Sequence, residues 1–73
     1  MSYMREDKQE IMNLLLKTLQ ATREYSDLVS LEYTKSKGLE LVVAEFDGGY
    51  HKPINVALDS GSAMIRDVLK ALR

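Results

Sequence analysis

The chain has 73 residues, ten of them Lys or Arg and eleven Asp or Glu, with a formal net charge of -1 and no cysteine. A chain of this length predicts one small domain over residues 1–73. The lack of cysteine excludes disulfides and thiolate metal sites, and a single histidine argues against a histidine-based metal site. The near balance of charge argues against binding dominated by nucleic-acid phosphates.

No apolar run approaches the ~20 residues that a membrane span requires, and the first residues lack the apolar core of a signal peptide. We therefore expect a cytoplasmic protein with no membrane contact, no metal and no cofactor. Domains this small often gain stability from disulfides, metals or self-association. Self-association is the one of these that the composition leaves open.

A first helix is predicted from about Arg5 to Tyr25. Its apolar residues recur at three- and four-residue steps, as in a helix that faces a core. They are Ile11, Met12, Leu15, Leu16 and Leu19. Leu14 falls outside the centre of this stripe, so the apolar face is wide. Part of that face could alternatively meet a partner chain.

Three strands follow. The first is predicted from about Leu28 to Lys35, where apolar and polar residues alternate. The central one is predicted over 39–46, an apolar run between two segments rich in turn residues. The third contains Pro53, which cannot donate to a strand ladder and therefore indicates an edge position. The predicted strand order is 1-2-3.

The strand register depends on the two turns. We interpret 36–38 as a three-residue loop and Gly48-Gly49 as a two-residue turn, since this choice gives both hairpins one apolar face. The predicted core face comprises Val29, Leu31, Tyr33, Leu39, Leu41, Val43, Ile54, Val56 and Leu58. The predicted outer face includes Glu40, Val42, Ala44, Phe46, His51, Pro53 and Ala57.

A last helix is predicted from about Ser60 to Leu72, with Asp59 or Ser60 as its cap. The predicted fold is thus an α+β, α-β-β-β-α two-layer sandwich, in which two helices pack on one face of a three-stranded antiparallel meander. The start of this helix also offers a possible anion site at Ser60, Gly61 and Ser62, because free amides and a helix dipole meet there. An ordinary helix cap explains the same residues.

The function most favoured is protein interaction, because the predicted outer face is more apolar than a lone domain requires. The interface is predicted at Val42, Ala44, Phe46, His51 and Pro53, with Phe46 as the anchor. A second copy is the economical partner, which predicts a homodimer. Another protein is the alternative partner for this face.

Two other functions receive less support. His51 lies near Asp47 and could act as a base, but no nucleophile accompanies it at a recognisable spacing, so we expect no enzyme. The element order is also that of double-stranded RNA-binding domains, which hold phosphates with lysines that open the last helix. Here that helix opens with acidic and neutral residues, and only Lys35, Lys37 and Lys52 could contact a nucleic acid. Nucleic-acid binding is for this reason the less favoured alternative to protein interaction.

Overall fold

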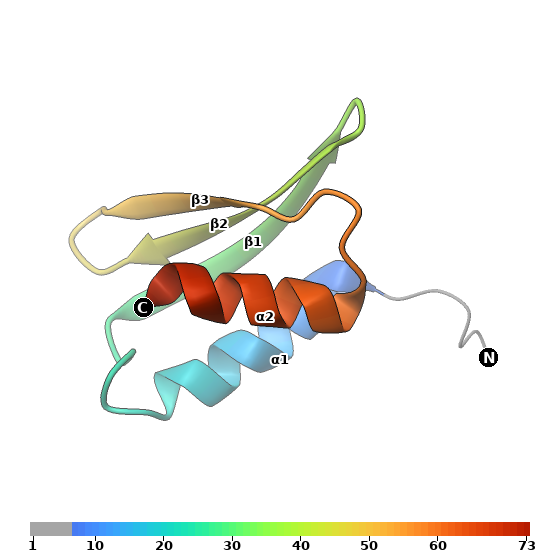
Figure 1. Ribbon diagram of the computed structural model, residues 1–73. Coiled ribbons are helices and arrows are strands. Elements are labelled where there is room, and N and C mark those ends of the chain that lie inside the picture. The colour runs from blue at the N-terminus through green and yellow to red at the C-terminus, as the bar shows by residue number, and fades with distance from the viewer. Residues whose placement is uncertain (1–6) are drawn as a thin grey trace.

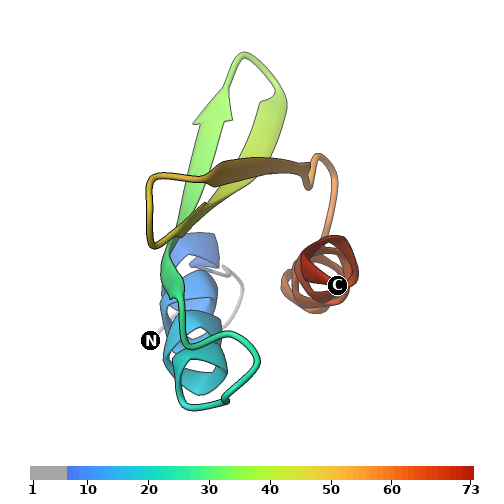
Figure 2. The ribbon, with the colours of Figure 1, turned by 90° about the vertical axis from the view of Figure 1, so that its left-hand side faces the viewer.

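The computed structural model describes residues 7–73 and contains two helices and one sheet. The sheet is antiparallel with the order β1-β2-β3, and both helices lie on the same side of it (Figures 1 and 2). The predicted fold class and strand order are confirmed. The elements are α1 (Lys8–Gln20), β1 (Leu28–Ser36), β2 (Leu39–Phe46), β3 (His51–Asn55) and α2 (Gly61–Leu72).

Helix α1 is shorter than predicted. At its start, the Asp7 carboxylate accepts a hydrogen bond from the Glu10 amide over 3.1 Å, and the predicted start at Arg5 lies outside the described residues. The helix ends at Gln20 instead of continuing to Tyr25. Thr22 explains the early end, because its hydroxyl donates to the Leu19 carbonyl over 2.6 Å and accepts from the Tyr25 amide over 3.3 Å. Such local bonds compete with those of a helix.

The hairpin between β1 and β2 turns through two residues, not the three predicted. Ser36 pairs directly with Leu39, which leaves Lys37 and Gly38 as the turn. Both have positive φ, 50° and 81° respectively, as a type I′ turn requires. The sequence did not indicate this turn because lysine seldom adopts the left-handed conformation.

The hairpin between β2 and β3 has a turn that is one residue longer than predicted. The Phe46 amide donates to the Tyr50 carbonyl over 2.8 Å, so that a three-residue loop, 47–49, replaces the predicted two-residue turn. Gly48 and Gly49 have φ values of 94° and 87°, which glycine adopts without steric cost. The predicted register was therefore wrong at both turns.

The two register errors lie on either side of β2 and invert that strand alone. Leu31 of β1 and Ile54 of β3 face the helices as predicted, and so do Val42 and Ala44 of β2, which were predicted to face outwards. Because β2 carries apolar residues on both faces, its alternation could not decide between the registers. Leu39, Leu41 and Val43 of β2 were predicted for the core and instead face outwards. Val29 is also exposed, at an irregularity of the β1 register between Leu28 and Ser30, and so is Leu58, which lies beyond β3.

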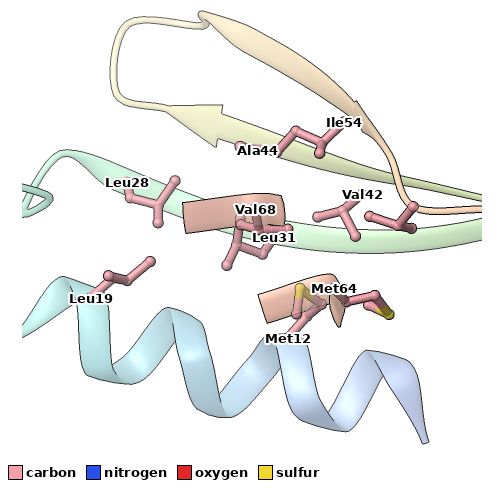
Figure 3. Packing of buried hydrophobic residues seen from close by; sticks show 10 residues of the cluster. Met12, Leu19, Leu28, Leu31, Val42, Ala44, Ile54, Met64 and Val68 are labelled. Atoms are coloured by element: carbon pink, nitrogen blue, oxygen red, sulfur yellow. The ribbon is translucent and has the colours of Figure 1, made fainter. Parts of the chain in front are cut away.

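The core lies between the sheet and the two helices. Met12 of α1 and Met64 of α2 are both 0% exposed, and both point into the apolar cluster beneath the sheet (Figure 3). The buried apolar residues are Met12, Leu19, Leu28, Leu31, Val42, Ala44, Ile54, Val56, Met64 and Val68. One small cluster therefore joins all five elements or their flanking residues.

Side chains of α1 satisfy the outer edge of β1. The Gln9 side chain accepts from the Tyr33 amide over 2.8 Å and donates to the Leu31 carbonyl over 3.1 Å. Gln20 donates to the Leu28 carbonyl over 2.9 Å. These bonds connect α1 to β1, and Figure 2 shows α1 beneath that strand. At the other edge of the sheet, β3 carries Pro53 at its centre, which has no N–H to offer a further strand.

Candidate interaction surfaces

The five residues predicted to form one interface do not share a face. Val42 and Ala44 are 0% exposed and belong to the core. Phe46 is half-buried, packs against the core and lies 5.5 Å from the Tyr50 ring, centroid to centroid. His51 and Pro53 are exposed on the other side of the sheet. The interface cannot use Val42 and Ala44 while the chain is folded, and this part of the prediction is corrected.

The outer face of the sheet nevertheless carries an apolar stripe along β2. Leu39, Leu41 and Val43 alternate with the inward-facing residues of that strand, and we call these three residues the outer stripe. Leu39 is 51% exposed, and the other two are half-buried. Both helices lie on the opposite side of the sheet (Figure 2). No described element therefore covers the outer stripe.

Opposite charges flank the outer stripe along β2. At one end Glu45 accepts a hydrogen bond from the Ser30 hydroxyl over 3.3 Å and lies 3.5 Å from the Nε2 atom of His51. At the other end Lys37 is exposed in the β1–β2 turn. The stripe thus has an acidic and a basic end, a polarity that a partner surface could match.

A charged cluster lies on the inner face of the sheet. The Oε1 atom of Glu40 accepts from the Lys8 ammonium and from the Tyr33 hydroxyl, each over 2.7 Å, and Glu40 is 7% exposed. The Lys8 ammonium also lies 5.7 Å from the centroid of the Tyr33 ring. The cluster joins α1, β1 and β2 through groups that satisfy one another, as buried charges require.

Glu40 makes the stability of the fold depend on pH in the acid range. The Lys8 hydrogen bond, followed by that from Tyr33, lowers the pKa of Glu40 to about 2. The carboxylate therefore stabilises the fold above its ordinary pKa, and this contribution is lost as the pH falls from the ordinary value towards the lowered one. The bond to Glu40 also raises the pKa of Tyr33, since an ionised phenol could not donate it; burial and the carboxylate charge act in the same direction.

We predict that Glu40→Gln lowers the thermal midpoint at neutral pH and weakens its fall with acid, because glutamine keeps the shape but not the charge. Thermal unfolding followed by circular dichroism from about pH 7 to about pH 2 measures both effects. The difference from the wild type should shrink across the acid range. Glu32→Gln, the same change at an exposed position of β1, is the matched control. Equal midpoints for Glu40→Gln and the wild type throughout would contradict the prediction.

The predicted anion site is occupied by helix-capping contacts. The Ser60 hydroxyl accepts from the Ala63 amide over 3.3 Å and lies 3.3 Å from the Ser62 hydroxyl, while Gly61 is buried. Ser60 is therefore the N-cap of α2, one of the two caps that the sequence allowed. Nearby, the carboxyl groups of Asp59 and Asp67 interact, which raises the pKa of Asp59 and lowers that of Asp67.

The three lysines of the nucleic-acid alternative are dispersed. Lys37 lies in the β1–β2 turn and Lys35 just before it, whereas Lys52 lies on β3 near the β2–β3 turn. These two turns lie at opposite ends of the sheet (Figure 1). The residues do not form one basic stripe.

No protein-family model, curated protein or solved structure matches this chain. Within residues 7–73, no group of three or more His, Cys, Asp or Glu side chains could hold a metal ion. Neither of the two described helices is long and apolar enough to cross a membrane.

Sequence reasoning missed the outer stripe because it assigned these residues to the core. Glu40 agreed with the wrong register, because a register that directs Glu40 outwards also directs Leu41 and Val43 inwards. A glutamate in the middle of an apolar strand ordinarily indicates the solvent face. Here Lys8 and Tyr33 satisfy the charge of Glu40 on the inner face. Lys8 is 32 positions away in the chain, so a local sequence pattern does not indicate this pairing.

Proposed function

We propose that this chain is a non-enzymatic, cytoplasmic protein-interaction module that self-associates through the outer face of its sheet. The observation that carries the proposal is the outer stripe, three apolar side chains on a face that no described element covers. Apolar patches of this kind usually mark interaction sites. The expected activity is therefore binding rather than catalysis.

The charges at the two ends of the outer stripe favour a second copy as the partner. A twofold axis through the middle of the outer stripe places one end of the stripe opposite the other end of its copy. Glu45 lies beyond one end of the outer stripe, and Lys37, in the β1–β2 turn, lies beyond the other end. Each copy would therefore set its acidic end against the basic end of the other, which favours this orientation over a parallel one.

The edges of the sheet favour association through a face. The outer edge of β1 is bonded to the Gln9 and Gln20 side chains, and Pro53 interrupts the donor row of β3. Strand addition at either edge would displace existing bonds or lack a donor. Side-chain packing across the outer stripe has neither cost.

We predict that Val43→Lys weakens self-association by more than about tenfold, since a charge in the centre of an apolar interface removes its packing. Lysine at this position faces Glu32 across the β1–β2 ladder, which should keep the strand folded. Light scattering over a concentration series measures the mass. Ser26→Lys adds the same charge in the exposed α1–β1 connection and should behave like the wild type. A Val43→Lys mass equal to that of the wild type at every concentration would rule out this face.

A further inference from the structure

A shallow apolar hollow lies between the two helices, on the side of the molecule away from the outer stripe. It has a volume of about 340 Å³ and is lined by Ile11, Leu14, Leu15 and Thr18 of α1 and Ile65 of α2. The Thr18 hydroxyl donates to the Leu14 carbonyl over 3.0 Å. Its polar atom is thus satisfied within the helix, and the lining is otherwise made of aliphatic side chains.

The hollow has the geometry of a coiled-coil packing hole. Its four α1 residues stand at positions i, i+3, i+4 and i+7, the diamond that receives one knob residue from a facing helix. Leu14 belongs to this diamond and is also 57% exposed, so that it can act as a knob. A surface that carries both a leucine knob and a hole for one is complementary to itself. Self-complementary surfaces generate twofold dimers.

The exposed charges of α1 select the direction of the second helix. Glu10 precedes Leu14 by one turn and Lys17 follows it by about one turn, and both are exposed. In an antiparallel pair of α1 helices crossing near Leu14, each Glu10 lies beside the partner's Lys17. A parallel pair would set like charges against each other, which is unfavourable.

We propose that the hollow between α1 and α2 docks α1 of a second copy in the antiparallel direction, with Leu14 of each copy entering the hollow of the other. This contact is independent of the proposed one at the outer stripe, since the helices lie on the opposite side of the sheet (Figure 2). The two contacts do not compete for the same residues. With both contacts intact, the assemblies grow beyond two chains as the protein concentration rises.

Charge variants separate the two contacts by light scattering. Leu14→Lys should raise the dissociation constant of the helix contact more than about tenfold, and the exposure of Leu14 should leave folding intact. Leu14→Lys and Val43→Lys should each stop at the mass of two chains, and the double variant should remain at one. The control Ser26→Lys should match the wild type. A Leu14→Lys mass equal to the wild-type mass throughout would overturn this proposal but not the one for the outer stripe.

Cysteine trapping tests the register directly, because the chain has no cysteine of its own. Glu10→Cys and Lys17→Cys chains are mixed and oxidised, and each is also oxidised alone. The antiparallel contact predicts several-fold more disulfide-linked dimer in the mixture than in either chain alone. Equal or smaller yields in the mixture would overturn the antiparallel contact. A wild-type chain that is monomeric at all concentrations would overturn both contacts.

Discussion

Val42→Lys is expected to leave the chain largely unfolded, whereas Val43→Lys is expected to leave it folded. The two positions are neighbours with the same side chain, but Val42 is 0% exposed and Val43 belongs to the outer stripe. An unpaired ammonium in the core costs several kcal/mol. A domain of this size has a stability of only about 4 to 11 kcal/mol.

Circular dichroism and urea unfolding of the two variants test this prediction. We expect Val42→Lys to lose most of its cooperative transition and Val43→Lys to keep a transition close to that of the wild type. This comparison also tests the strand register, because the two possible registers exchange the faces of these residues. The reverse result, with Val43→Lys unfolded and Val42→Lys folded, would show that β2 faces the other way.

Met64→Ala is expected to lower the free energy of unfolding by about 2 to 5 kcal/mol, the usual cost of truncating a fully buried methionine. Met64 of α2 belongs to the same buried cluster as Met12 of α1 and the inward-facing residues of the sheet (Figure 3). A cavity at this point removes contacts from both helices at once. Urea unfolding at neutral pH measures the loss.

The matched control is Leu58→Ala, which truncates an apolar side chain that is 96% exposed. The backbone conformation at this position, φ 66°, is as unfavourable for alanine as for leucine, so the change should be close to zero. If Met64→Ala lowered the free energy of unfolding no more than Leu58→Ala, the result would contradict the packing of α2 against the buried cluster.

The elements and their order could be predicted from the sequence because their signals are local. The apolar stripe that includes Met64 and Val68 follows helical spacing, and the β2 run lies between turn segments. Ser60 indicated the start of α2, and Pro53 indicated an edge strand. Each of these signals depends on a few neighbouring residues and on the short-range chemistry of caps, turns and alternation.

The face of β2 could not be predicted because it depends on two turns whose chemistry the sequence leaves ambiguous. Lys37 adopts a left-handed conformation, which its side chain does not suggest. The inward position of Glu40 depends on Lys8, which is 32 positions away in the chain. Val42 and Val43 are chemically identical, so the candidate interface changed with the register.

The two α1 glutamines that bond to the edge of β1, and the proline in β3, affect how the protein behaves at high concentration. Copies that associate spend much of their time close together, which is also when an unpaired strand can recruit another and begin a cross-β fibril. Gln9 and Gln20 occupy one amide and two carbonyls of β1 that a recruited strand would use. Contact between copies and resistance to amyloid growth can therefore coexist in one small chain.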